Sequence, residues 1–317
     1  MIQHSRNTLP LSYIQAWALA AALAGAIACG HSDRPSGPTV IDPPMVTTTA
    51  VLVGAGDIAD CGNDRGAPAE ATAKLVDAIP NAAVFTAGDN AYPTASKADY
   101  DGCYHPRWGR HKGRTRPAPG NHEYEYDRHD GAAYYGYFGG VAAPPDGYYS
   151  YDLAAWHVVV LNSNAEVPSG PGSAQLEWLR QDLRESSARC TLAIWHHPRF
   201  TSGPSRGFPG EGNVMGDVWN VLYEFKADVI VNGHDHFYER FAAQAPDGSP
   251  DSTNGIRQFI VGSGGASLYP VTAPKRNSER WIGAYGIIQL SLHPATYEWN
   301  FIPAPGGAPD SGAGTCH

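Results

Sequence analysis

Short apolar runs alternate with helical patterns along most of the chain. Six runs rich in β-branched and other apolar residues are each bounded by Gly, Pro, Asn or Asp, which is typical of buried strands. They occupy residues 50–53, 83–86, 157–161, 192–195, 229–231 and 258–261. Between them, residues 69–79, 173–186 and 214–227 carry apolar side chains at helical spacing, and Ser173 is a candidate N-cap. Strands that alternate with helices predict an α/β fold.

Polar side chains follow directly after several of these runs. Five short motifs carry them: Gly56-Asp57, Gly88-Asp89-Asn90-Ala91-Tyr92, Gly120-Asn121-His122-Glu123, Trp195-His196-His197-Pro198 and Gly233-His234-Asp235-His236. Gly-Asp and Gly-Asn are ordinary turn dipeptides, so a turn alone would explain any single motif. In open α/β sheets, however, ligands bind where the loops at the carboxyl ends of the strands converge. The motifs offer carboxylate, amide, imidazole and phenol groups without a thiolate, which suits a pair of hydrolytic metal ions better than a structural zinc.

Composition and charge narrow the range of partners. The chain has 317 residues, of which 42% are hydrophobic, enough for a substantial core, and its 36 Gly and 26 Pro residues predict many loops. The formal net charge of −9 argues against nucleic acid or an anionic membrane surface as the main partner. A small phosphorylated substrate stays compatible with this charge, because bound cations reverse the local potential.

The N-terminal region is typical of an export signal. Residues 1–28 combine Arg6 with an uncharged stretch at 16–28, which is shorter than the roughly 20 residues that span a bilayer. The stretch ends in Ala26-Ile27-Ala28-Cys29-Gly30, which resembles a bacterial lipobox except at Ala26. We therefore expect export to the bacterial cell envelope with Cys29 acylated, or secretion by ordinary cleavage, or a retained anchor. A Pro-rich linker is expected at 29–47 and one catalytic domain at 48–317.

The remaining cysteines agree with an oxidising compartment. Their number is even and they show no CxxC spacing, so two disulfides are expected, although three pairings or four free thiols are open. We favour Cys61–Cys103, since both follow proposed ligand motifs on one rim. We also favour Cys190–Cys316, which would pin the C-terminal segment.

With the five motifs in this order, the chain resembles the calcineurin-like metallophosphoesterases, and among them the purple acid phosphatases. The resemblance extends over about residues 50–303. It implies a four-layer α/β/β/α sandwich of two mixed β-sheets flanked by helices. It also implies an exported phosphatase that hydrolyses phosphate monoesters through attack of a metal-bridging hydroxide.

The resemblance also implies a role for each motif residue. Asp57, Tyr92 and His236 would hold the first metal, Asp89 would bridge both, and the second would be held by Asn121, His196 and His234. The metals implied are Fe(III) with Fe(II), Zn(II) or Mn(II). His122 would act on the phosphate or the leaving oxygen as the catalytic residue. A packing role is the alternative for Tyr92, and a structural role is the alternative for His122.

Substrate contacts are less well defined by the sequence. His197, Arg199 and Arg206 are candidates, although we expect the side chain of His197 to point away from His196. Glu123 is expected to support a ligand or its loop. Two alternatives to the monoesterase are a phosphodiesterase or nucleotidase on the same fold, and a non-catalytic surface binding protein. The pattern gives no oligomeric state.

Overall fold

The computed structural model describes residues 48–125, 129–204, 215–271 and 273–317. The predicted signal peptide, the linker, Cys29 and Arg206 lie outside these ranges. Among the described residues, no helix has both the length and the apolar character needed to cross a membrane.

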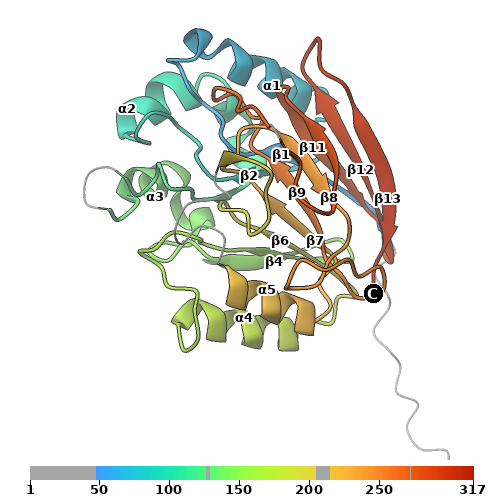
Figure 1. Cartoon of the computed structure of the whole chain (residues 1–317). Coiled ribbons are helices and arrows are strands. Elements are labelled where there is room, and N and C mark those ends of the chain that lie inside the picture. Colours follow the sequence, from blue (N-terminus) through green and yellow to red (C-terminus); the bar gives the residue numbers. More distant parts are fainter. Residues whose placement is uncertain (1–47, 126–128, 205–214, 272) are drawn as a thin grey trace, which may run out of the picture. The chain divides into compact units, whose positions relative to one another are not determined.

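Two mixed β-sheets form the centre of the described fold (Figure 1). The first has the strand order β13-β12-β11-β1-β2-β3, and the second has the order β10-β8-β9-β7-β6-β5-β4. In the first sheet, β1, β2 and β3 run parallel to one another, and β11, β12 and β13 continue the sheet from β1 in antiparallel pairs. In the second sheet, β5, β6, β7 and β9 run parallel, and β4, β8 and β10 pair antiparallel at its two ends. The strands are β1 (Ala50–Ala55), β2 (Ala83–Ala87), β3 (Thr115–Ala118), β4 (Tyr149–Leu153), β5 (Trp156–Val160), β6 (Cys190–Ile194), β7 (Val229–Asn232), β8 (Tyr238–Phe241), β9 (Arg257–Val261), β10 (Ser278–Ile282), β11 (Gly286–Leu292), β12 (Thr296–Pro303) and β13 (Asp310–Thr315).

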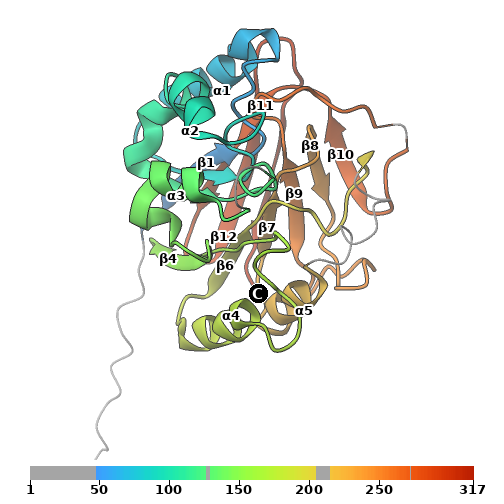
Figure 2. The same cartoon turned by 90° about the vertical axis from the view of Figure 1, so that its left-hand side faces the viewer.

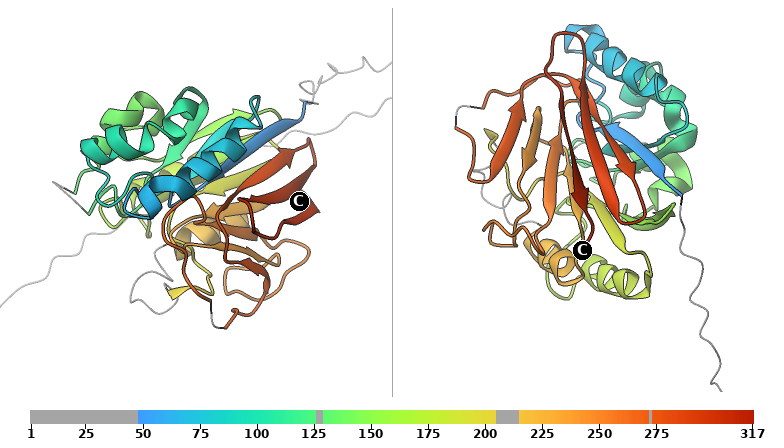
Figure 3. Two further views of the ribbon diagram at one scale, coloured as in Figure 1. Left: turned by 90° about the horizontal axis from the view of Figure 1, so that it is seen from above. Right: turned by 90° about the vertical axis from the view of Figure 1, so that its right-hand side faces the viewer.

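Helices cover the outer sides of the two sheets (Figures 2 and 3). The helix bounds are α1 (Ala67–Asp77), α2 (Lys97–Asp99), α3 (Ala132–Phe138), α4 (Ala174–Glu185) and α5 (Gly216–Glu224), with short helical turns η1 (Asp64–Gly66), η2 (Tyr100–Tyr104), η3 (Trp108–Arg114) and η4 (Gly139–Ala142). The Ser173 side chain accepts a hydrogen bond from the backbone N–H of Leu176, so it caps α4 as predicted.

Three apolar clusters define the layers. One lies between the sheets and contains Leu52 and Leu192. A second joins α4 and α5 to the second sheet, and a third joins α1 and α3 to the first sheet. This arrangement is the predicted four-layer α/β/β/α sandwich.

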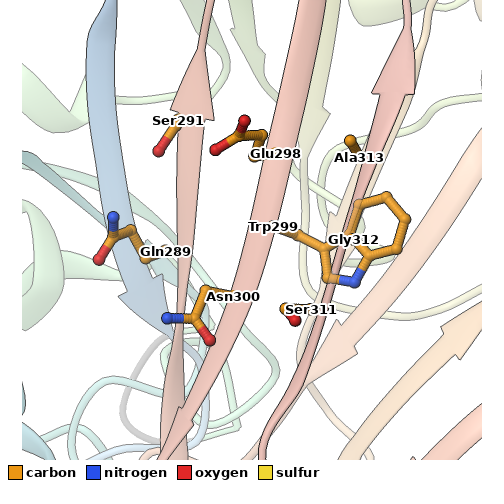
Figure 4. A pocket seen from close by; sticks show the side chains of 8 residues that line it. All are labelled: Gln289, Ser291, Glu298, Trp299, Asn300, Ser311, Gly312 and Ala313. Carbon is orange, nitrogen blue, oxygen red and sulfur yellow. The ribbon is translucent and has the colours of Figure 1, made fainter.

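Polar side chains line part of the outer face of β11, β12 and β13, and no helix is drawn across β12 and β13 (Figure 3). Gln289 lies opposite Asn300, which lies opposite Ser311, so amide and hydroxyl groups form a row across the three strands. A cavity of about 540 Å³ lies over this row (Figure 4). Polar residues at alternate positions are typical of a sheet with one solvated face.

A buried imidazole joins the edge of the second sheet to α4. His157 on β5 places Nδ1 2.9 Å from Asp152 Oδ1 and Nε2 2.8 Å from Asp182 Oδ2. Ser150 Oγ donates to the other oxygen of Asp182. Burial alone would lower the pKa of His157, but the two carboxylates raise it above its usual value. Both ring nitrogens can donate only in the protonated form, so the cluster binds an imidazolium.

We expect this cluster to make stability fall as pH rises. Because the folded-state pKa lies above the unfolded value near 6.5, the stabilisation is complete below that value and is lost through the folded-state pKa. His157→Gln cannot titrate and should cost about 1.5–3 kcal/mol at low pH, the typical contribution of a hydrogen bond to a charged group, and less at high pH. Urea unfolding of both proteins near pH 5.5 and pH 9 measures this difference. An equal cost at both pH values would contradict the assignment.

Candidate metal centre

Five parallel strands bring the predicted ligands to one edge of the sandwich. Each ligand follows the carboxyl end of its strand: Asp57 follows β1, Asp89 follows β2, Asn121 follows β3, His196 follows β6, and His234 and His236 follow β7. The two sheets therefore both contribute to the site. The convergence expected from the positions of the motifs is present.

The turns after these strands adopt unusual backbone conformations. Asp57, Asp89 and His234 have φ values of 59°, 48° and 71°. Such conformations in residues other than glycine cluster at functional sites. The neighbouring glycines permit close approach, because a Cβ on Gly88 would lie 2.4 Å from the His196 ring.

The first cluster contains Tyr92, Asp57, Asp89 and His236. Tyr92 Oη lies 3.0 Å from Asp57 Oδ1, 3.0 Å from Asp89 Oδ2 and 3.2 Å from His236 Nε2. His236 Nε2 is also 3.2 Å from Asp57 Oδ1. The single phenol proton can serve only one of the three acceptors around it. A cation would satisfy all four atoms.

The second cluster contains Asn121, His196 and His234, and it also includes Asp89. Asn121 Oδ1 lies 3.0 Å from both His196 Nε2 and His234 Nδ1, and these two nitrogens are 3.1 Å apart. Asp89 Oδ2 is 3.2 Å from His196 Nε2. The same Asp89 oxygen therefore lies beside both clusters, as a bridging ligand requires.

Backbone and side-chain partners turn the lone pairs of these groups toward the site. His196 Nδ1 is 2.8 Å from the Ala87 carbonyl and His236 Nδ1 is 2.7 Å from the Ser267 carbonyl. A carbonyl oxygen only accepts, so each Nδ1 carries its proton and each Nε2 can present a lone pair. The Asn121 amide nitrogen donates to Glu125, which turns Oδ1 toward the histidines.

The site favours positive charge. The side chains of Asp57 and Asp89 are 0% and 2% exposed. Burial would lower the pKa of His196, yet these carboxylates, chiefly Asp89, raise it to about 10. Burial, with Asp57 and Asp89, raises the pKa of Tyr92 well above 10, so only a strongly Lewis-acidic cation would convert it to tyrosinate. Buried carboxylates surrounded by oxygen and imidazole donors fit two metal ions.

His122 lies at the edge of both clusters. Its backbone N–H donates to Asp89 Oδ1 at 2.9 Å, and its Nδ1 is 2.7 Å from the Pro93 carbonyl. Nε2 is therefore the nitrogen directed toward the site, 3.8 Å from Asp89 Oδ2. Burial opposes protonation, but Asp89 and Glu125 raise the pKa of His122 overall.

Glu123 holds the two loops that carry Asp89 and Asn121. Its carboxylate accepts backbone N–H bonds from Asp89 at 3.0 Å, Asn90 at 2.8 Å and Gly120 at 2.6 Å. The Tyr100 hydroxyl donates to it as well. The predicted supporting role of Glu123 is confirmed by these bonds.

The expectation for His197 is wrong. Its ring lies 4.9 Å from that of His196 and 4.5 Å from that of His234, so it borders the second cluster and does not point away. Ser163 Oγ holds its Nδ1 at 2.8 Å. Residues after Ile194 leave the strand, so the alternation of side chains that holds within strands ends before His197.

The two candidate arginines have different outcomes. Arg199 donates from Nε and from one terminal nitrogen to the Pro246 carbonyl, and its guanidinium lies 5.3 Å from the Phe200 ring centroid. These bonds attach Arg199 to the loop at residue 246. Arg206 lies outside the described residues.

Both favoured disulfides are present. Cys61 pairs with Cys103, and Cys190 at the start of β6 pairs with Cys316 after β13. The first pair attaches the loop after Asp57 to η2. The second attaches the C-terminal segment to the second sheet.

One contributing segment was missed by the sequence analysis. Residues 262–269 follow β9, and the Tyr269 ring stacks on His236 with centroids 4.0 Å apart and 12° between the planes. An apolar run followed by glycines, Val261-Gly262-Ser263-Gly264-Gly265, repeats the pattern of the other motifs. That pattern could have identified the segment.

Comparison with known proteins places this geometry in a family. The family described as Calcineurin-like phosphoesterase matches residues 47–238. Purple acid phosphatase 21 of Arabidopsis thaliana is 36% identical over 98 residues, covering 30% of this chain and 22% of that protein. Purple acid phosphatase 23 of the same plant is 29% identical over 155 residues, covering 43% and 33%. The matches thus span about a fifth to a third of these relatives.

Solved structures show the same fold. Purple acid phosphatase PPD1 from yellow lupin seeds superposes with a TM-score of 0.67 at 18% identity, covering 85% of this chain and 54% of that chain. GAP50, the anchor in the inner membrane complex of Plasmodium, gives 0.63 at 12% identity, covering 85% and 89%.

Proposed function

The chain belongs to the calcineurin-like phosphoesterase family, on its purple acid phosphatase-like branch, and from this premise we propose that it is an exported phosphatase with a dinuclear metal centre that hydrolyses phosphate monoesters. The observation that carries the proposal is the pair of donor clusters that share Asp89 Oδ2. Asp57, Tyr92 and His236 would hold one ion. Asn121, His196 and His234 would hold the other.

The ions and the protein have separate tasks in this proposal. Two bound cations would supply a nucleophile from water near neutral pH and would neutralise charge on the phosphoryl oxygens. The protein fixes the directions of the donor atoms through the Ala87 and Ser267 carbonyls. Glu123 keeps the loops of Asp89 and Asn121 in register.

His122 is the proposed general acid. The Pro93 carbonyl holds its Nδ1–H, so the second proton of the imidazolium resides at Nε2. In the protein chain alone, Asp89 and Glu125 outweigh the effect of burial and raise the pKa of His122, which favours a proton at Nε2. A proton at Nε2 can pass to the leaving oxygen of an ester bound beside Asp89.

Export is supported by the disulfides. The four cysteines of the predicted catalytic domain form two intramolecular pairs. Such pairs form and persist in oxidising compartments. Lipid attachment at Cys29, or cleavage beside it, stays a prediction from the sequence.

The preference for a monoester or a diester substrate tests the proposed monoesterase activity. We expect kcat/KM for p-nitrophenyl phosphate to exceed that for bis-p-nitrophenyl phosphate by at least about tenfold, and dialysis against a chelator to remove both activities until metal is restored. A tenfold preference for the diester would replace the monoesterase with a phosphodiesterase. Metal-replete protein without turnover of either ester between about pH 4 and pH 10 would indicate a binding protein.

Tyr92 reports the identity of the first metal. If that metal is ferric iron bound by tyrosinate, we expect Tyr92→Phe to lose visible absorption, because phenylalanine retains the packing of the ring on His122 but has no oxygen ligand. The measurement is the visible spectrum of each protein at equal iron content. Tyr124→Phe, which changes a buried tyrosine of the neighbouring loop, is the control and should keep its colour. Unchanged absorption in Tyr92→Phe would exclude tyrosinate as the chromophore.

A further inference from the structure

Residues 262–269, which we call the glycine segment, lie against the first motif. The N–H of Gly264 donates to the Gly56 carbonyl and the N–H of Ala266 donates to the Asp57 carbonyl, both at 2.9 Å. A Cβ on Gly264 would lie 2.4 Å from the Gly56 oxygen. Only glycine therefore permits this approach, and it brings the segment against the backbone that carries Asp57.

The same segment surrounds His236 on two sides. The Ser267 carbonyl accepts from His236 Nδ1 at 2.7 Å, and the Tyr269 N–H donates to the His236 carbonyl at 3.0 Å. The Tyr269 ring lies parallel to the imidazole, with 4.0 Å between centroids. One stretch of eight residues thus accepts a hydrogen bond from His236 Nδ1, donates one to the His236 carbonyl and stacks a ring on its imidazole.

The two side-chain constraints fix different directions. The hydrogen bond at Nδ1 selects the tautomer and fixes one in-plane direction of the imidazole, but it still permits the ring to tilt about that bond. The Tyr269 ring restricts this tilt, since with the ring centroids only 4.0 Å apart a tilted imidazole would clash with it. Together they fix the direction of the Nε2 lone pair.

These contacts of the glycine segment are made to ligands of one proposed metal site. Asp57 and His236 both belong to the first cluster, with Tyr92. In the second cluster, His196 is held by the Ala87 carbonyl and Asn121 by Glu125, outside the glycine segment. The hydrogen bonds that join the segment to Asp57 and His236, and its stacked ring, are therefore made to ligands of one of the two neighbouring sites.

We propose that Tyr269 is a positioning residue for His236, and that the glycine segment sets the affinity of the site formed by Asp57, Tyr92 and His236 separately from its neighbour. The proposal rests on the proposed function, since it needs two metal sites. Loss of an outer partner of a metal-binding histidine typically costs 10- to 100-fold in affinity.

Zinc titration of metal-free protein against a chromophoric chelator tests this, in two backgrounds. His196→Ala disables the second site and His236→Ala disables the first. We expect Tyr269→Leu to weaken zinc binding about tenfold or more in the His196→Ala background and to leave it unchanged in the His236→Ala background. Tyr269→Phe keeps the stacked ring and should bind as the parent does in both.

Controls separate positioning from a general loss of structure. Tyr148→Leu removes a half-buried tyrosine that packs on Trp178, and it should change binding in neither background. Thermal unfolding of the metal-free variants checks folding, and Tyr269→Met provides a second non-aromatic variant should leucine lower the Tm.

Three results would overturn the proposal. They are equal weakening in both backgrounds, no weakening in the His196→Ala background, and a phenylalanine variant as weak as the leucine variant. Failure of the wild-type protein to bind two zinc ions would instead contradict the proposed function and, with it, this proposal.

Discussion

Replacing Asp89 is expected to remove both metal ions and to lower kcat/KM for p-nitrophenyl phosphate by at least about 10³-fold. Loss of a single group that stabilises the transition state electrostatically already costs up to about 10³-fold, and the loss of Asp89 affects two cations. Its Oδ2 lies 3.0 Å from Tyr92 Oη in the first cluster and 3.2 Å from His196 Nε2 in the second. Its Oδ1 accepts the backbone N–H of His122. No other described side chain is hydrogen-bonded or ion-paired to Tyr92, His196 and the His122 backbone together.

The choice of substitution affects this experiment. Asp89 has φ of 48°, where alanine is strained and asparagine is tolerated. Asp89→Asn therefore tests the bridging charge with little change in backbone strain, and Asp89→Ala serves as the second variant. Asp146→Ala changes an exposed carboxylate and should leave activity and metal content unchanged. Retention of one tightly bound ion per chain in Asp89→Asn would contradict the bridging role.

Replacing His122 is expected to lower kcat by about 10²–10⁴-fold for an alkyl phosphate, the range typical of a lost general acid. The effect on p-nitrophenyl phosphate should be smaller, because p-nitrophenolate leaves without protonation. The ligand clusters do not include the His122 side chain, so His122→Ala should retain both metals. The measurements are kcat for the two esters and metal content.

A histidine outside the site provides the control variant for the His122 experiment. His105 is exposed and hydrogen-bonded to Tyr137 away from the clusters, and His105→Ala should behave as wild type for both esters. An equal loss for both esters in His122→Ala would contradict proton donation to the leaving group. Loss of metal would show that His122 acts through the ligand loops.

The sequence predicts the parallel strands of the fold well, except for β3, which reads Thr-Arg-Pro-Ala, and it predicts the antiparallel strands poorly. Strands such as β6 are buried on both faces and appear as continuous apolar runs. β13 reads Asp-Ser-Gly-Ala-Gly-Thr, which carries no apolar periodicity. Its glycines are required because a Cβ at Gly312 would lie 2.3 Å from the Trp299 ring and a Cβ at Gly314 2.3 Å from the Tyr297 ring. The position of β13 therefore depends on the aromatic side chains of β12, which leave room only for glycine at these two positions.

The residues of the candidate site also differ in how well the sequence predicts them. Motif residues such as Asp89 could be identified because their chemical types and order are unusual, and Glu123 because it belongs to a motif that also carries a proposed ligand. The position of His197 depends on where β6 ends, which the apolar run does not define to one residue. Tyr269 is one of 17 tyrosines, and only the contact between the loop after β9 and the loop after β7 distinguishes it.

Metal content with a visible spectrum, measured on wild-type protein purified without added metal, tests the dinuclear centre most directly. The two clusters predict about two metal ions per chain, and a ferric ion at Tyr92 predicts a charge-transfer band in the visible. Two ions of zinc or manganese in a colourless protein would contradict the ferric tyrosinate and keep the dinuclear centre. One ion per chain or none would contradict the dinuclear centre itself.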